Sequence, residues 1–324
     1  MAQDTPRKPV GKQPVPSGRY PGKPLTKKQR RSQSAARSVS LERRKPWQSP
    51  TIVTTVSVAV VAVVLIVIVL INQVGAGNAV VATQVPPAIL NAVEHPSPTV
   101  VNTVGTGGQP GQMIRMPASA KLLDAHGNPL IVFVGAEYCP YCAAERWSIV
   151  MWLSRFGTFH NLSEMTSSSS DAYPNTNTFT FHKASYTSPY LTFSANELQD
   201  RNQAQLESMT TQIANIFTKY DNPPYTSESG QYPFINIGGV FSLHSTSYSP
   251  ALLEAGSTPL SWSQIAAKLS NPSDPVTQAI VGNANILTAA TCIATGDSPA
   301  SVCSPTTSNT IQAIENALKA IKPS

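Results

Sequence analysis

Apolar positions are distributed very unevenly along this chain. The stretch 52–71 is apolar without a single charged residue, and Thr54, Thr55 and Ser57 are its only polar members. At a rise of about 1.5 Å per residue, a helix of this length crosses a hydrocarbon core of about 30 Å. The pattern therefore predicts one transmembrane helix near the N-terminus, with bounds 51–73.

The segments on either side of this span have contrasting patterns. Residues 1–50 are rich in Pro, Ser, Lys, Arg and Gln and have almost no large apolar side chains, so we expect a disordered leader. The Gly-, Pro-, Val- and Thr-rich residues 74–112 are expected to form a tether. The remaining residues, 113–324, are enough for one domain with a hydrophobic core.

Within this domain the periodicity of apolar residues alternates between that of strands and that of helices. Strands are expected at 130–136, 178–182, 190–193, 233–237 and 240–243, and helices at 140–156, 196–220, 262–269, 275–287 and 310–321. Gly238-Gly239 is typical of a β-hairpin turn, and Gly157 is expected to cap a helix. This order predicts an α/β fold with a mixed central sheet flanked by helices.

Charge indicates which side of the membrane each part occupies. Residues 1–50 carry thirteen Lys or Arg against Asp4 and Glu42, a net charge of +11, whereas the rest of the chain has a net charge of −5. This asymmetry predicts a single-pass plasma-membrane protein with a cytoplasmic N-terminus and an extracytoplasmic domain. The long span and leader favour an uncleaved signal anchor, while the small residues 76–79 leave cleavage open. Because membrane topology explains the basic leader, we expect no nucleic-acid partner.

Two cysteines follow directly after the apolar run 130–136. They belong to the sequence Cys139-Pro140-Tyr141-Cys142, which is expected at the N-terminus of a helix. Free N–H groups and the helix dipole stabilise a thiolate there, so the pKa of Cys139 is expected to be lowered. Two thiols at this spacing can close and reopen a disulfide. The pattern therefore predicts thiol–disulfide exchange, with Cys139 as the nucleophile and Cys142 as the resolving thiol.

A metal site and an inert structural disulfide are the alternatives for these two cysteines. Zinc usually takes four protein ligands, but the other cysteines, Cys292 and Cys303, have ten residues between them and the five histidines are scattered singly. We therefore expect no metal and no organic cofactor. Cys292 and Cys303 are expected to form a structural disulfide between two C-terminal helices, with an electron-relay pair as the alternative.

Residues around the two cysteines have possible supporting roles. Pro140 and Tyr141 are expected to tune the reduction potential by shaping the start of the helix. Glu137 and Glu145 flank the thiols, and either would accept a proton from Cys142 if buried. A solvated surface carboxylate is the expectation for Glu145.

Other aromatic and histidine residues have simpler explanations. Trp147, Trp152 and Phe156 fall at near-helical spacing and are expected in the core, and His160 and His182 are expected to be ordinary polar residues.

The segment Gly135–Cys142 resembles the active-site loop of the thioredoxin superfamily. Cys-Pro-Tyr-Cys is typical of glutaredoxins, and the preceding Ala-Glu-aromatic-Cys of thioredoxins. In that superfamily a cis X-Pro bond opens the third strand opposite the cysteines, and Tyr232-Pro233 matches it. The resemblance implies a thioredoxin-like fold with an insertion at 158–232, a C-terminal helical extension, and a substrate chain held in extended form by the backbone before Pro233.

The domain also resembles a membrane-anchored family, domain of unknown function nine-two-nine. The similarity lies in the segments 142–147 and 154–159 and in the two later cysteines. Together, these features predict a membrane-anchored extracytoplasmic thiol–disulfide oxidoreductase. Its partners would be protein thiols or disulfides, the lipid bilayer, and a membrane redox partner such as a quinone-coupled disulfide-generating protein. The alternative is a non-catalytic binding or assembly module of thioredoxin fold with a structural disulfide.

Overall fold

The computed structural model describes residues 83–109, 112–304 and 308–324. The leader 1–50 and the transmembrane helix 51–73 expected from the sequence lie outside these residues. Within the described part, α8 (Pro275–Thr295) is the one helix long and apolar enough to cross a membrane, by length and composition alone. Because 89% of its most apolar window is buried inside the domain, α8 has the character of a core helix.

A five-stranded mixed sheet forms the centre of the domain. Its strands lie in the order β2 (Ile114–Arg115), β10 (Phe241–Leu243), β9 (Phe234–Ile237), β3 (Leu130–Gly135) and β8 (Thr192–Glu197). Strand β3 is parallel to β8 and antiparallel to β9, which is in turn antiparallel to β10. The predicted mixed sheet and the predicted hairpin are therefore confirmed.

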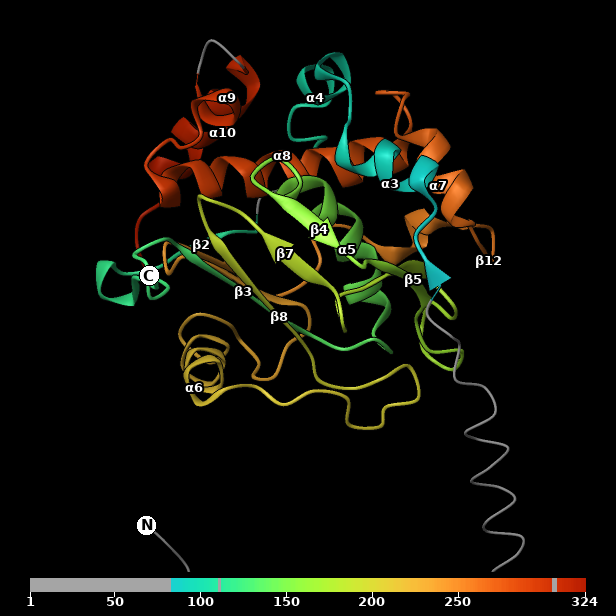
Figure 1. Cartoon of the computed structure of the whole chain (residues 1–324), viewed down its shortest axis with the longest axis horizontal. Helices are drawn as coiled ribbons and strands as arrows, with labels where there is room; N and C mark the ends of the chain where they lie inside the picture. The colour runs from blue at the N-terminus through green and yellow to red at the C-terminus, as the bar shows by residue number, and fades with distance from the viewer. Residues whose placement is uncertain (1–82, 110–111, 305–307) are drawn as a thin grey trace, which may run out of the picture. The chain divides into compact units, whose positions relative to one another are not determined.

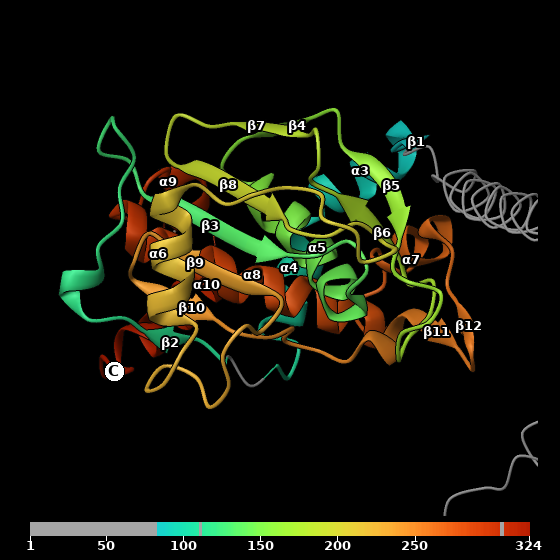
Figure 2. The ribbon, with the colours of Figure 1, turned by 90° about the horizontal axis from the view of Figure 1, so that it is seen from below.

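Helices cover both faces of this sheet. In Figures 1 and 2, α5 (Pro140–Leu153) and α8 lie on one face and α6 (Thr211–Tyr220) lies on the other. Successive side chains of β3 point to opposite faces of the sheet, so this strand contributes to two cores. Ile131 and Phe133 belong to the core formed with α5 and α8, and Val132 and Val134 to the smaller core formed with α6. Strand β3 is consequently buried over its whole length.

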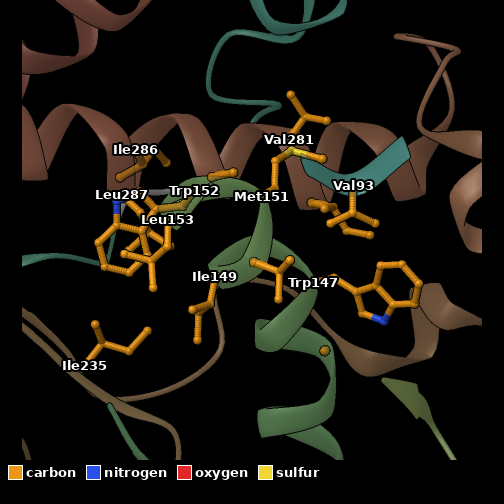
Figure 3. Close-up of a cluster of buried hydrophobic side chains, with 14 of the residues drawn as sticks. Val93, Trp147, Ile149, Met151, Trp152, Leu153, Ile235, Val281, Ile286 and Leu287 are labelled. Carbon is orange, nitrogen blue, oxygen red and sulfur yellow. The ribbon is translucent and has the colours of Figure 1, made fainter. Parts of the chain in front are cut away.

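The larger core is built around α5, whose side chains pack against α8 and the sheet (Figure 3). Trp147 and Trp152 are fully buried, and Phe156 is 2% exposed, which confirms their predicted place in the core. The indole nitrogen of Trp147 donates to the carbonyl of Asn177 at 2.9 Å, and that of Trp152 donates to Thr291 Oγ1 at 2.8 Å. The N–H group of each buried indole therefore has a hydrogen-bond partner.

The expected helix at 196–220 is wrong in its first half. Asn196 and Glu197 end β8, where they pair with Val134 and Gly135 of β3. Residues 198–210 form turns and irregular structure. Helix α6 begins only at Thr211, and the side chain of Thr210 caps it by accepting the backbone N–H of Ile213. Pairing with a buried neighbouring strand outweighs the local helical periodicity here.

Helix α5 is also shorter than expected, because it ends at Leu153 with Ser154 as its C-cap. Gly157 does not cap it. A Cβ at Gly157 would lie 2.3 Å from the carbonyl oxygen of Thr187, in β7 (Ser185–Thr187). Glycine is required there because the two backbones approach closely.

Two helices lie in the stretch 74–112 that was expected to be a tether. They are α3 (Pro87–Glu94) and α4 (Pro98–Val104), each with proline at its first position. Val93 and Val100 are buried, and the two helices contact α5, α8 and α7 (Trp262–Lys268). The folded domain therefore begins before residue 113, and the expected boundary is wrong.

Short strands and terminal helices complete the described part. The segment between α5 and β8 supplies β4 (Thr158–His160), β5 (Ser163–Thr166), β6 (Asn177–Thr180) and β7, of which only β6 was expected; β1 (Thr83–Gln84) pairs with β5. The other elements are η2 (Ala118–Ala120), η3 (Pro250–Leu253), β11 (Glu254–Ala255), β12 (Thr258–Pro259), α9 (Ala300–Cys303) and α10 (Asn309–Lys319). The strand expected at 190–193 forms as β8, shifted towards the C-terminus.

The predicted bond between Cys292 and Cys303 is present. It joins α8 to α9 with an S–S distance of 2.04 Å, and its two cysteines are 0% and 1% exposed. Such enclosure suits a structural role, because no reductant reaches these sulfurs from solvent without local opening.

Replacing both residues, Cys292→Ala with Cys303→Ala, is expected to lower the free energy of unfolding by about 2–4 kcal/mol. The reason is that the unfolded chain gains freedom when the cross-link is lost. Chemical denaturation of the full chain, with and without the two substitutions, measures this difference. Equal midpoints would contradict a structural role for the bond.

Candidate functional site

The site is formed where β3 turns into α5. Cys139 is the N-cap of α5, and its Sγ accepts the backbone N–H of Cys142 at 3.3 Å. Pro140 occupies the first helical position, where a missing N–H costs nothing and a fixed φ favours the helix. The sequence Cys-Pro-Tyr-Cys thus supplies both the cap and the start of the helix.

The two thiols have opposite electrostatic surroundings. A hydrogen bond from the Cys142 thiol is the largest influence on Cys139 and lowers its pKa; burial opposes this, and the backbone N–H of Cys142 and the charge of Arg146 lower it further. Burial raises the pKa of Cys142 well above its usual value, and the neighbouring Cys139 adds to the rise. The thiolate form is therefore favoured at Cys139 and the protonated form at Cys142.

Gly135 makes room for the second thiol. A Cβ at this position would lie 3.0 Å from Cys142 Sγ and 2.6 Å from the ring of Phe133. A larger residue at the end of β3 would require the ring of Phe133 and the sulfur of Cys142 to shift. No local pattern in the sequence points to this role of Gly135, because the contact forms only when α5 packs on the sheet.

Arg146 is the most important residue that the sequence analysis missed. It lies four residues after Cys142 on α5, is fully buried, and pairs with Glu197 through Nε at 2.9 Å and Nη2 at 2.6 Å. Nη2 also donates to the carbonyl of Ala136 at 2.9 Å. The positive charge of Arg146 favours the thiolate of each cysteine.

Glu137 is partly buried beside this ion pair. Its carboxylate accepts a hydrogen bond from Thr180 Oγ1 at 2.5 Å rather than from either thiol. Burial raises the pKa of Glu137, partly offset by Thr180, and the charges of Arg146 and His182 also act on it. His182 itself pairs with Glu207 at 2.6 Å near the surface. Ionisable groups therefore extend from Arg146 towards solvent.

Glu145 is not the solvated surface carboxylate that was expected. It is fully buried and accepts hydrogen bonds from Thr246 Oγ1 at 3.0 Å, the backbone N–H of Ser247 at 3.1 Å and Asn283 Nδ2 at 2.6 Å. Burial raises its pKa. These partners place Glu145 against α8 and the segment after β10, where it links buried elements.

Tyr232 and Pro233 lie across the sheet from the end of β3. Val134 pairs with Phe234, so Pro233 precedes β9 at the level of Gly135. The Tyr232–Pro233 peptide bond is cis, the isomer that the thioredoxin resemblance implies. Burial raises the pKa of Tyr232, and negative charge on Cys142, Asp221 and Cys139 raises it further.

A polar loop covers the cysteines from the other side. The backbone N–H of Ser168 donates to the carbonyl of Tyr138 at 2.9 Å, and the rings of Tyr141 and Tyr173 meet edge to face at 5.9 Å. Tyr141 is 38% exposed, whereas Cys139 is only 6% exposed. The loop 167–176 therefore packs against the residues on either side of Cys139, whose sulfur is largely enclosed.

A second polar cluster has the connectivity of a hydrolase triad. Ser242 Oγ lies 2.9 Å from His244 Nε2, and His244 Nδ1 lies 3.0 Å from Asp221 Oδ1. Ser242 is fully buried within β10, however, and its hydroxyl also contacts the sulfur of Met116. No substrate can reach it, so the cluster is a buried network that ties the end of α6 to the sheet.

Metal ligands are not gathered anywhere in the described ranges: no three His, Cys, Asp or Glu side chains there are placed to hold an ion together.

The described part of the chain is an α/β domain in which a Cys-x-x-Cys pair lies where a strand of the mixed sheet turns into a helix. The chain belongs to the family described as domain of unknown function (DUF929), which matches residues 116–293, more than half of the chain. The predicted membership of that family is confirmed. No curated protein matches the chain, and no solved structure matches it.

The charge of Arg146 gives the first prediction for the site. Substituting Arg146→Met together with Glu197→Met removes both charges and leaves neither buried without its partner. Because the guanidinium lowers the pKa of Cys139, we expect that pKa to rise and alkylation of Cys139 near neutral pH to slow.

Mass spectrometry of iodoacetamide-treated protein across a pH series measures the rate at Cys139 specifically. In the unsubstituted chain the rate should rise through a midpoint below that of an ordinary thiol, about 8.5. Arg146→Lys, which keeps the charge, serves as the matched control. Identical midpoints for the double variant and the unsubstituted chain would show that Arg146 does not tune the thiol.

Proposed function

We propose that this protein is a thiol–disulfide oxidoreductase with a thioredoxin-like domain. The observation that carries the proposal is the pair Cys139–Cys142 at the start of α5, with one thiol favoured as thiolate and the other held protonated. The parallel pair β3–β8, the hairpin β9–β10 beside β3, and Tyr232-Pro233 in front of β9 support the thioredoxin-like assignment.

The reaction proceeds in two exchanges. In the reducing direction, the thiolate of Cys139 attacks one sulfur of a substrate disulfide, and the other substrate sulfur leaves as a thiolate that takes up a proton. Cys142 then loses its proton and attacks Cys139 Sγ, which breaks the mixed disulfide and releases the second substrate thiol. Two electrons pass to the substrate, and the pair Cys139–Cys142 becomes a disulfide; the oxidising direction is the reverse.

The proton lost by Cys142 needs an acceptor. We assign this role to Glu137, because burial raises its pKa and because it interacts with Arg146, which acts on both thiols. The partly exposed pair His182–Glu207 lies on the solvent side of Glu137. In this assignment Arg146 stabilises the thiolates, and Glu137 carries the proton outward.

One observation favours the alternative of a non-catalytic binding module. Cys139 is only 6% exposed, because the loop 167–176 covers it. An oxidoreductase of this design requires the loop to move or the substrate to displace it. The exposed ring of Tyr141 and the adjacent Tyr173 form the surface that a substrate chain would meet first.

The partners of the proposed oxidoreductase are inferred from the sequence. The proposed membrane anchor would hold the domain outside the cytoplasm, where protein thiols and disulfides are the substrates and a membrane redox partner recycles the pair. No metal or organic cofactor takes part in the proposed exchange.

Single cysteine substitutions test the mechanism. Cys142→Ser is expected to trap mixed disulfides with partner proteins, because Cys139 still attacks and nothing resolves the product. Cys139→Ser should trap none, and Cys139→Ser with Cys142→Ser is the matched control. Non-reducing gels of the purified chain reveal the trapped species, and mass spectrometry identifies the partners. Trapping by Cys139→Ser alone would reverse the assigned roles, equal trapping by both single variants would contradict a division of roles, and none by either would favour the binding module.

The membrane topology gives a separate prediction. Protease added to intact cells should digest the chain beyond about residue 75 and spare an epitope tag in the leader, because the basic segment stays in the cytoplasm. Immunoblots against tags at the two ends provide the measurement. Protection of the C-terminal tag in intact cells, with digestion after permeabilisation, would refute the extracytoplasmic placement.

A further inference from the structure

A pocket of about 350 Å³ lies away from the cysteines, among the ends of several helices. It is bounded by the end of α3, by α4, by the residues after α5, and by α9 and α10. These parts of α4, α9 and α10 lie on the side of α8 that faces away from the sheet (Figure 1). The volume suits a small molecule.

The walls of this pocket are largely apolar, but a cation opens into it. Arg155 follows α5, and its Nη1 donates to Thr288 Oγ1 of α8 at 2.8 Å. Its Nη2 is enclosed and has no hydrogen-bond partner. Burial alone lowers the pKa of Arg155 to about 10. An enclosed guanidinium nitrogen without an acceptor is costly, so an anionic group from outside the chain is the natural complement.

An acid opens into the same pocket. Oε1 of Glu94, at the end of α3, is likewise enclosed and makes no hydrogen bond of good geometry. Burial raises the pKa of Glu94, whereas the charge of His95 and the hydroxyl of Ser154 lower it. Glu94 and Arg155 do not form an ion pair with each other, although both line the pocket. No ion pair in the described part of the chain uses Glu94 or Arg155, so a ligand that carries both charges can pair with each of them.

Polar and apolar side chains share the rest of the wall, and its polar members are His95, Asn102, Ser301 and Ser308. Val101, Val302 and Ile311, with Pro96 and Pro98, line the pocket between and around the polar groups. Apolar walls with a few convergent polar groups are typical of sites for small organic ligands.

We propose that this pocket binds a small amphipathic zwitterion, with a carboxylate at Arg155, an ammonium group at Glu94 and an apolar body against Val101, Val302 and Ile311. Hydrophobic α-amino acids have this chemistry. The site is separate from Cys139 and Cys142, and it does not depend on the proposed redox activity. The walls formed by Ser301 and Val302 adjoin the disulfide at Cys303, which holds α9 in place beside α8.

A purely structural role for Arg155 is the competing explanation. Its bond to Thr288 joins the end of α5 to α8, and water could complete the remaining nitrogen. Thr288→Val removes that bond and leaves every pocket residue in place. A structural role therefore predicts that Thr288→Val and Arg155→Met change ligand binding to a similar extent. A binding role predicts that only Arg155→Met abolishes it.

Three matched probes test the proposal on the full chain purified in detergent micelles. L-phenylalanine carries both charged groups, 3-phenylpropanoate lacks the ammonium group, and 2-phenylethylamine lacks the carboxylate. Calorimetry and saturation-transfer NMR measure their binding. We expect L-phenylalanine to bind, and each single-group analogue to bind about tenfold more weakly or worse, because each forfeits a charged hydrogen bond.

Substitutions test whether L-phenylalanine binds in this pocket. Arg155→Met and Glu94→Gln should each weaken L-phenylalanine binding about tenfold or more, while Thr288→Val and Lys183→Met, which lies outside the pocket, should leave it unchanged. Circular dichroism confirms that each variant is folded. The proposal is overturned if L-phenylalanine does not bind at millimolar concentration, if 3-phenylpropanoate binds equally well, or if binding survives Arg155→Met.

Discussion

The guanidinium of Arg146 lies wholly inside the domain, and three segments of the chain meet at it. Arg146 belongs to α5, Glu197 ends β8, and the carbonyl of Ala136 follows β3. Removing two charges from water is so costly that the pair persists only with close geometry and additional hydrogen bonds. Nε and Nη2 of Arg146 make these contacts, whereas Nη1 is buried without a hydrogen-bond partner. Because Cys142 lies one turn before Arg146 on the same helix, the same contacts also fix where the thiols lie. Gly135 contributes to the same arrangement, because its lack of a side chain leaves room for Cys142 Sγ beside the sheet.

The same constraint separates the chemistry of the two thiols. Cys139 at the helix start gains N–H donors and the influence of a buried cation, whereas Cys142, one turn further in, is enclosed completely. In the proposed mechanism, this difference in surroundings separates the nucleophile from the resolving thiol. The loop 167–176 adds a restriction on access, since it is pinned by Ser168 to Tyr138 and by Arg201 to Ser167 and Asn175. Reactivity would then depend on what displaces this loop as well as on the thiolate itself.

Local signals in the sequence predicted the parts of the fold that depend on local structure. The buried strand β3, the helix start at Cys139, the Gly238-Gly239 hairpin and the Cys292–Cys303 bond all follow from short-range patterns. The Arg146–Glu197 pair did not, because its members are 51 residues apart and neither is unusual in its own segment. Glu145 was misplaced because a carboxylate is normally solvated, and only the packing of α5 against α8 and the segment after β10 supplies its three donors. Helices α3 and α4 were missed because short Pro- and Val-rich segments have little periodicity and gain their stability from docking.

The most direct test of this account is the redox equilibrium of the Cys139–Cys142 pair in the full chain. Equilibration against graded dithiothreitol mixtures, followed by acid quenching, alkylation and mass spectrometry, reports the state of each cysteine. The account predicts that Cys139–Cys142 closes and reopens reversibly in a two-electron transition while Cys292–Cys303 stays oxidised. A pair that never closes, or one that opens only together with Cys292–Cys303 on unfolding, would contradict the proposed thiol–disulfide exchange.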